Sequence, residues 1–175
     1  MQFNLTPHPT TPPADPTFKV WVSVDHSGAF GAMATTNIWF GIGAPARRFT
    51  IPKGEAGRAE DLWQATCFEA FLRCEEEYRE WNFAPNGQWA AVDFAAYRER
   101  SGDADVAAPY IRMEDNLTWW AVGATIAVEA GVEWQLGLSA ILEEKDGTKS
   151  YWALAHADGD KPDFHDPVCF AARLA

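Results

Sequence analysis

Cysteine is scarce in this chain of 175 residues, and no two cysteines have the spacing of a metal or redox site. The three cysteines, Cys67, Cys74 and Cys169, are an odd number, and no C-x-x-C motif occurs. A disulfide-stabilised or zinc-binding scaffold is therefore not expected, and buried thiols in a reducing compartment are the simplest interpretation. The first residues lack the basic and apolar parts of a secretory signal, so we expect a cytoplasmic protein.

Basic residues are few, and long apolar runs are missing. The 14 Lys and Arg residues face 25 Asp and Glu residues, for a formal net charge of −11. Phosphate backbones and anionic lipid headgroups repel such a chain, so neither nucleic acid nor a membrane is an expected partner. The longest nearly uncharged apolar run, 119–132, contains Glu129 and is too short to span a bilayer.

Sequence motifs that announce a reaction are also missing. The chain has no G-x-S-x-G, no P-loop, no EF-hand spacing and no C-x-x-C-H. With 25 acidic residues some carboxylate pair is inevitable, so such a pair does not by itself indicate a glycosidase. We therefore expect a protein that is not an enzyme.

Aromatic residues are plentiful, with nine Trp, eleven Phe and four Tyr. The length predicts one domain spanning 1–175 with a sizeable core. Short apolar segments alternate with turns about every ten residues, which is typical of an all-β sandwich or barrel. Asn86-Gly87 and Asp146-Gly147 predict hairpin turns. A short first strand precedes a proline-rich connector at 7–16, and the other expected strands are 18–24, 37–42, 78–84, 88–97, 119–128, 136–144, 150–155 and 168–174.

One segment, 62–81, has two interpretations. Its apolar residues follow one another in steps of three and four, which fits an amphipathic helix, and Glu75-Glu76-Glu77 also favours a helix. The alternative is a strand at 66–73, a charged turn at 74–77 and a second strand from Tyr78 onward. The pattern alone leaves both open.

Four blocks of sequence carry a resemblance to a known family. They are 62–72 (LWQATCFEAFL), 78–91 (YREWNFAPNGQWAA), 151–156 (YWALAH) and 163–167 (DFHDP). Together they resemble the bacterial DOMON-like proteins related to type 9 carbohydrate-binding modules, over most of the chain. The resemblance implies an antiparallel two-sheet β-sandwich of the jelly-roll or immunoglobulin-like kind, with 66–73 as a strand.

The resemblance also implies a ligand site. Type 9 modules hold a sugar between two tryptophans, while carboxylate, amide and basic side chains bind its hydroxyls. Trp63 is similar to the first clamp residue and Trp152 to the second. The implied function is non-catalytic binding of a small saccharide or a similar flat polar ligand.

Further candidate residues come from the pattern itself. Glu69 would sit in a strand that is apolar on both faces, so it must be paired, hydrogen-bonded or facing a cleft. Asn82 and Arg98 could donate to a ligand at the rim, and His156 shares the face of Trp152. Each of these residues also has a structural interpretation: core packing for the aromatic side chains, and ion pairs or surface positions for the polar ones.

Other functions stay open. A haem-binding DOMON-type domain would need axial ligands such as Met33, Met113, His156 or His165. The acidic loop around Asp158 could hold calcium, although we expect no cofactor. An interaction or scaffold domain without a small ligand is the third alternative. Trp81 and Trp89 are expected to pack together in the core, and Trp119 and Trp120 to point to opposite faces of a strand.

Overall fold

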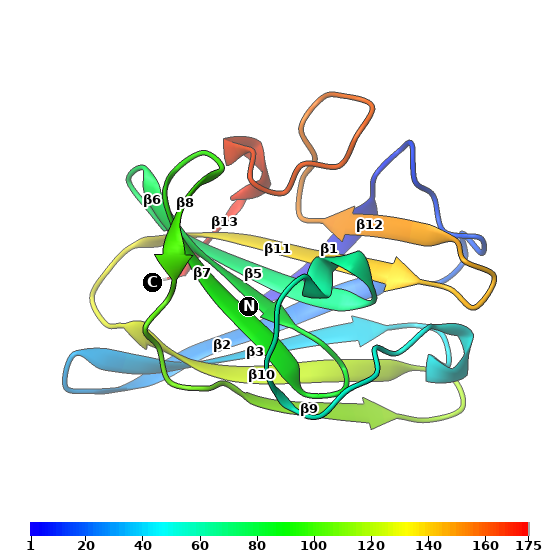
Figure 1. The fold of residues 1–175 in the computed structure, drawn as a ribbon, viewed down its shortest axis with the longest axis horizontal. Coiled ribbons are helices and arrows are strands. Elements are labelled where there is room, and N and C mark those ends of the chain that lie inside the picture. Colours follow the sequence, from blue (N-terminus) through cyan, green and yellow to red (C-terminus); the bar gives the residue numbers. More distant parts are fainter. Residues whose placement is uncertain (175) are drawn as a thin grey trace.

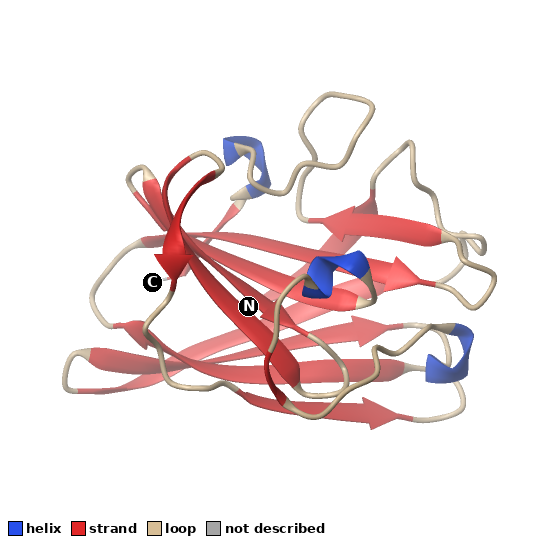
Figure 2. Cartoon of the chain, in the orientation of Figure 1, coloured by secondary structure: helices blue, strands red, loops and turns tan. Residues whose placement is uncertain are grey.

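β-strands form nearly all of the regular structure in this computed structural model, which describes residues 1–174 (Figures 1 and 2). The all-β prediction is confirmed. The strands are β1 Gln2–Pro7, β2 Val20–Phe30, β3 Met33–Ile42, β4 Gly57–Arg58, β5 Cys67–Cys74, β6 Glu77–Phe83, β7 Gln88–Ala96, β8 Glu99–Asp103, β9 Tyr110–Asp115, β10 Trp120–Glu129, β11 Trp134–Glu143, β12 Lys149–Ala153 and β13 Ala172–Leu174. Three short 3-10 helices are η1 Ala46–Arg48, η2 Leu62–Gln64 and η3 Pro167–Cys169. No helix in residues 1–174 has the length and apolar character needed to cross a bilayer.

The strands follow one continuous hydrogen-bonded path, in the order β4-β7-β6-β5-β11-β12-β1-β2-β3-β10-β9. Strand β1 joins its two halves, because Gln2 to Leu5 pair with β2 while Thr6 and Pro7 pair with β12. The result is a single curled sheet (Figure 1). The prediction of two separate sheets is not confirmed in that detail.

The segment 62–81 is a strand, a turn and a strand, so the helical interpretation is wrong. Strand β5 pairs with β11 on one side and with β6 on the other. All residues from Cys67 to Leu72 are buried, because both faces of this strand are covered. A strand buried on both faces shows no polar alternation, and its apolar residues then match a helical period by accident.

Both predicted hairpin turns are present. Gly87, between β6 and β7, has a φ of 86°, and Gly147, between β11 and β12, has a φ of 91°. These left-handed values favour glycine. The expected strand 168–174 is instead the helix η3 followed by β13. Strands β4, β8 and β9 were not predicted, although Ile111 and Met113 alternate with polar residues along β9.

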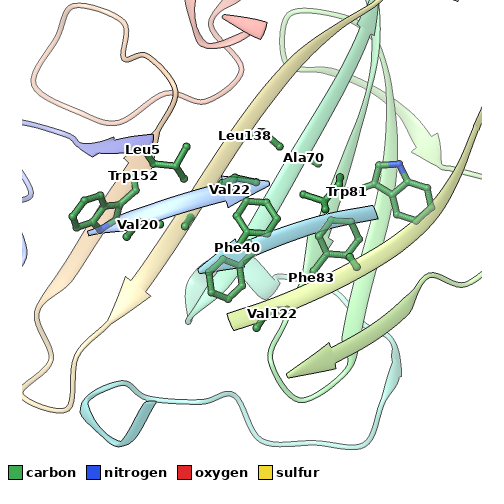
Figure 3. Packing of buried hydrophobic residues seen from close by; sticks show 14 of the residues in the cluster. Leu5, Val20, Val22, Phe40, Ala70, Trp81, Phe83, Val122, Leu138 and Trp152 are labelled. Atoms are coloured by element: carbon green, nitrogen blue, oxygen red, sulfur yellow. The ribbon is translucent and has the colours of Figure 1, made fainter. Parts of the chain in front are cut away.

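The main core lies inside the curl of the sheet (Figure 3). Phe68 on β5 contacts Phe40 on β3 and Trp120 on β10, with ring centroids 5.2 and 5.6 Å apart. Trp81 and Trp89 pack together in this core, with centroids 6.1 Å apart, as predicted. The neighbours Trp119 and Trp120 also differ as predicted, since Trp119 is exposed and Trp120 is buried.

Candidate functional site

A cleft of about 1030 Å³ lies on the face of β5, β6, β7, β11 and β12 that points away from the main core. Its walls come from four further parts of the chain: residues 10–11, residues 58–63, residues 98–103 and the loop at 160–165, which is drawn in orange and red in Figure 1. Apolar wall residues are Phe71, Val92, Phe94, Ile141 and Phe164. The acidic and basic residues of the lining are Arg58, Glu60, Asp61, Glu69, Glu80, Arg98, Arg100, Asp103, Asp160 and Lys161.

The floor of the cleft follows from strand alternation. Glu69 on β5 lies directly opposite Asn82 on β6 and Ser139 on β11. Because side chains of paired residues point to the same face, all three point away from the core. Glu80, two residues before Asn82, shares that face, and both Glu69 and Glu80 line the cleft.

Hydrogen bonds fix the floor. The Ser139 hydroxyl donates to Glu69 Oε2 over 2.7 Å. The Asn82 amide donates from Nδ2 to Glu80 Oε1 over 2.6 Å. Asn82 Oδ1 in turn faces the Cys67 thiol, with Sγ 3.4 Å away. The amide of Asn82 is thereby oriented, and one oxygen of each carboxyl group is held in place.

The two floor carboxyl groups disfavour each other's ionisation. Burial and, to a smaller extent, the charge of Glu80 raise the pKa of Glu69 to about 8 against the opposing bond from Ser139. Burial also raises the pKa of Glu80, while the bond from Asn82 and the charges of Arg98 and Arg100 lower it. Two neighbouring buried carboxyl groups are stabilised when one of them holds a proton. Such a pair offers both a donor and several acceptors to a ligand.

A chain of hydrogen bonds forms the wall beside Glu80. The backbone N–H of Arg98 donates to the Tyr78 hydroxyl over 3.0 Å, and that hydroxyl lies 2.8 Å from His165 Nδ1. With Nδ1 accepting the Tyr78 proton, Nε2 carries the ring hydrogen and lies 3.6 Å from Glu80 Oε2. Burial lowers the pKa of His165 to about 4, so the ring is neutral at pH 7.

The arginines of the lining are already engaged. Arg58 donates to the carbonyls of Ala91 and Ala104 and stacks over Trp89, 4.3 Å from the ring centroid. Arg98 pairs with Asp163 over 2.8 Å, and Arg100 pairs with Asp103 over 2.6 Å. None of these three guanidinium groups forms a salt bridge to Glu69 or Glu80 in residues 1–174.

Trp63 stands at the edge of the cleft. It belongs to η2, whose preceding residue, Asp61, has a left-handed φ of 56°. Leu62 is buried against Cys67 and Ala84, and this contact pins the short helix to the sheet. Trp63 is 52% exposed and lines the cleft, so its indole ring is available to a ligand.

The structure brings together four of the six predicted site residues: Trp63, Glu69, Asn82 and Arg98 all line the cleft. The position of Trp152 differs from the prediction. Along β12 the preceding residue, Tyr151, faces the cleft, so Trp152 points to the main core, where it is 3% exposed (Figure 3). The predicted clamp of Trp63 and Trp152 is therefore not formed.

His156 does not line the cleft either. Its Nε2 donates to the carbonyl of Thr6 over 2.8 Å, and its ring packs edge-on against His8 with centroids 5.0 Å apart. Burial lowers its pKa. His156 thus ties the loop after β12 to the end of β1.

Several residues of the cleft were not predicted from the sequence as site residues. Glu80 had a detectable signal, because it alternates with Asn82 along β6 and must share its face. His165 had drawn attention only as a haem ligand and reaches the cleft through an irregular loop. Arg58, Arg100 and Tyr151 had no signal, since their placement depends on how distant segments cover the sheet.

The residues that could serve as haem ligands lie in different parts of the fold. Met33 lies on β3 and Met113 on β9, whereas His165 lines the cleft. Within residues 1–174, no three His, Cys, Asp or Glu side chains cluster in a way that could hold a metal ion.

Comparisons with known proteins reveal a shared fold. No protein-family profile and no curated protein sequence matches the chain. Among solved structures, the chain is similar to a candidate carbohydrate-binding protein from Bacteroides uniformis, with a TM-score of 0.61 and 12% sequence identity. The similarity covers 97% of this chain and 83% of that one. At this identity the likeness establishes the fold that the two proteins have in common.

Proposed function

We propose that this chain is a non-catalytic binding protein for a small saccharide, which it holds in the cleft between Trp63 and the floor of Glu69, Glu80 and Asn82. The observation that carries the proposal is a buried carboxylate and amide floor beneath an exposed indole ring. The fold shared with a candidate carbohydrate-binding protein supports it. A relationship to the DOMON-like proteins, and the two-sheet sandwich that goes with it, belong to the same proposal.

The chemistry of a pyranose fits these groups. Its flat C–H face stacks on the Trp63 indole, and its hydroxyls exchange hydrogen bonds with the carboxyl groups and the Asn82 amide. A single stacking contact and a few hydrogen bonds give an affinity of about micromolar to millimolar. The resemblance expected two stacking tryptophans, whereas here the second wall is built from smaller rings such as Phe164 and Tyr151.

A matched pair of variants tests the role of Trp63. We expect Trp63→Ala to weaken saccharide binding by about tenfold or more, measured by titration calorimetry over a panel of mono- and disaccharides, because it removes the stacking surface. Trp119→Ala is the control, since Trp119 is also exposed but lies outside the cleft lining. The proposal fails when no saccharide in the panel binds, or when the two variants weaken binding equally.

Two assays separate this proposal from the alternatives. Wild-type protein should leave nitrophenyl glycosides intact, and turnover that vanishes in Glu69→Gln would instead make the floor carboxyls catalytic. Addition of haemin should produce no Soret shift, and a shift lost in His165→Ala would favour the haem-binding domain.

A further inference from the structure

The floor of the cleft holds two buried carboxyl groups, Glu69 and Glu80, and in the described residues neither forms a salt bridge to Lys or Arg. In the described part of the chain, Glu69 has no basic side chain within salt-bridge distance, and Glu80 has only His165 Nε2 at 3.6 Å. Burial holds the pKa of His165 at about 4, so the imidazole supplies no positive charge at pH 7. Buried carboxyl groups in proteins are usually paired with a cation or hydrogen-bonded. Here both carboxyl groups accept hydrogen bonds, from Ser139 and Asn82, and these two partners are uncharged.

One oxygen of Glu69 is left over for a ligand. The side chain is 97% buried as judged by its 3% exposure, and Oε2 is occupied by the Ser139 hydroxyl. Within residues 1–174, Oε1 accepts no hydrogen bond, and it is not fully enclosed by the protein. Since Glu69 lines the cleft, Oε1 is the atom that meets the cleft's contents.

The three arginines of the lining are committed elsewhere. Arg98 and Arg100 reach Asp163 and Asp103, and Arg58 is fixed on two backbone carbonyls above Trp89. Moving any of them to the floor would break these interactions. Lys161 also lines the cleft, but it is exposed and forms no salt bridge to Glu69 or Glu80 within residues 1–174. A cation in contact with the floor would therefore come from the ligand.

We infer that the cleft recognises an amino sugar, whose primary ammonium group lies between Glu69 Oε1 and Glu80 Oε2 while its ring stacks on Trp63. This inference rests on the proposed saccharide function and names the ligand class of the same site. An ammonium group brings three donors and a positive charge that favours ionisation of the carboxyl pair, and charge-assisted hydrogen bonds are about twice as strong as neutral ones. A hydroxyl brings one donor and no charge, so it does not favour ionisation of the pair.

The test compares ligands that differ only in this charge. Calorimetric titrations at pH 7 use glucose, 2-amino-2-deoxyglucose, 6-amino-6-deoxyglucose and the N-acetyl form of each amino sugar. We expect one of the amines to bind about tenfold tighter than glucose, and acetylation of its nitrogen to remove the gain. Equal binding of glucose and both amines overturns the inference.

A charge-matched pair of variants locates the effect. Glu69→Gln keeps the shape and the bond from Ser139, and we expect it to lower the preference for the amine to about twofold or less while glucose binding persists. Glu55→Gln removes the same charge from an exposed residue outside the cleft lining and should keep the preference. A preference that survives Glu69→Gln, or that falls equally in both variants, contradicts the inference.

These outcomes separate the inference from the function beneath it. Sugars that bind in a Trp63-dependent way without any preference for an amine leave the proposed function intact and overturn only the ligand class. Absence of binding for every sugar removes both. The comparison of amine with N-acetyl sugar uses wild-type protein, so it decides the question even when Glu69→Gln does not fold.

Discussion

At the scale of single residues, Glu69 makes the fold sensitive to pH. Burial, aided by the charge of Glu80, raises its pKa from 4.5 to about 8. A carboxyl group whose pKa is raised on folding contributes its full stability below the unfolded-state pKa. It loses that contribution as the pH rises through the folded value. Between pH 4.5 and 8, Glu69 ionises in the unfolded chain but keeps its proton in the folded chain. The free energy of unfolding therefore falls as the pH rises through this range.

Replacement by a neutral isostere exposes this effect. We expect Glu69→Gln to match the wild type in free energy of unfolding near pH 4.5, and to exceed it at pH 8 by on the order of 3 kcal/mol. Urea unfolding across this range measures the difference, and His165, which titrates in both proteins, cancels. Glu60→Gln, an exposed control, should differ from the wild type in free energy of unfolding by the same amount at every pH. A pH-independent difference for Glu69→Gln would show that its carboxyl group is not desolvated.

Two tryptophans of the same expected clamp show what residue-level patterns can predict. Alternation along 150–155 correctly places Tyr151 and Trp152 on opposite faces, but it does not say which face is the core. That choice depends on Phe18, which packs against Trp152 with ring centroids 5.3 Å apart. The position of Trp63 after Glu60 and Asp61, at the start of an element, favours exposure without excluding a place in the core.

At the scale of elements, local patterns predicted the hairpins but left the central strand β5 open, and only the family resemblance favoured a strand there. Asn86-Gly87 and Asp146-Gly147 act locally, because their left-handed backbone is a property of two residues. Strand β5 depends instead on the strands on both sides of it, and its composition alone fits a helix equally well. Its partner β11 lies about 70 residues further along, a separation that no local pattern records.

Strands β2 and β3 provide an element-scale prediction. Trp21 lies opposite Gly41, and its ring covers the glycine so closely that an added Cβ would be 2.2 Å from the ring. We expect Gly41→Ala to displace the indole and to lower the free energy of unfolding by about 1–3 kcal/mol. Denaturant unfolding measures this loss, and a red shift of the tryptophan emission reports the displaced ring.

A double-mutant cycle provides the control for this prediction. In a Trp21→Ala background the space above Gly41 is open, so Gly41→Ala should cost less than about 0.5 kcal/mol. The same cost in both backgrounds would show that the glycine is required by its backbone and not by the ring above it.

At the scale of the whole molecule, the cleft is assembled from segments that the sequence keeps apart. The sheet supplies Glu69, Glu80 and Asn82, which strand alternation could place on one face. The covering walls come from the segments 10–11, 58–63, 98–103 and 160–165, whose sequences show no regular alternation of apolar residues. The cleft residues on the strands could therefore be predicted from the sequence, whereas those on the walls could be identified only from the three-dimensional structure.

The loop after β12 is held over the cleft mainly by Asp163. Its carboxylate accepts hydrogen bonds from the Tyr97 hydroxyl at 2.5 Å, from Arg98 at 2.8 Å and from the backbone N–H of His165 at 3.1 Å. Although burial opposes ionisation, these bonds keep the pKa of Asp163 below its usual value. The carboxylate is thus charged at neutral pH and joins the loop to the segment beside β8.

Loss of this anchor should open the loop without unfolding the sheet. We expect Asp163→Ala to raise hydrogen–deuterium exchange across 157–166 by about tenfold and to weaken ligand binding, because charge-assisted bonds that hold a cleft wall are lost. Exchange in β5, β6 and β11 should stay unchanged, since their pairing does not involve the loop. Asp158→Ala is the matched control, an exposed acid of the same loop without a side-chain partner in residues 1–174. Equal exchange in the two variants would mean that packing of Phe164, and not the Asp163 carboxylate, holds the wall in place.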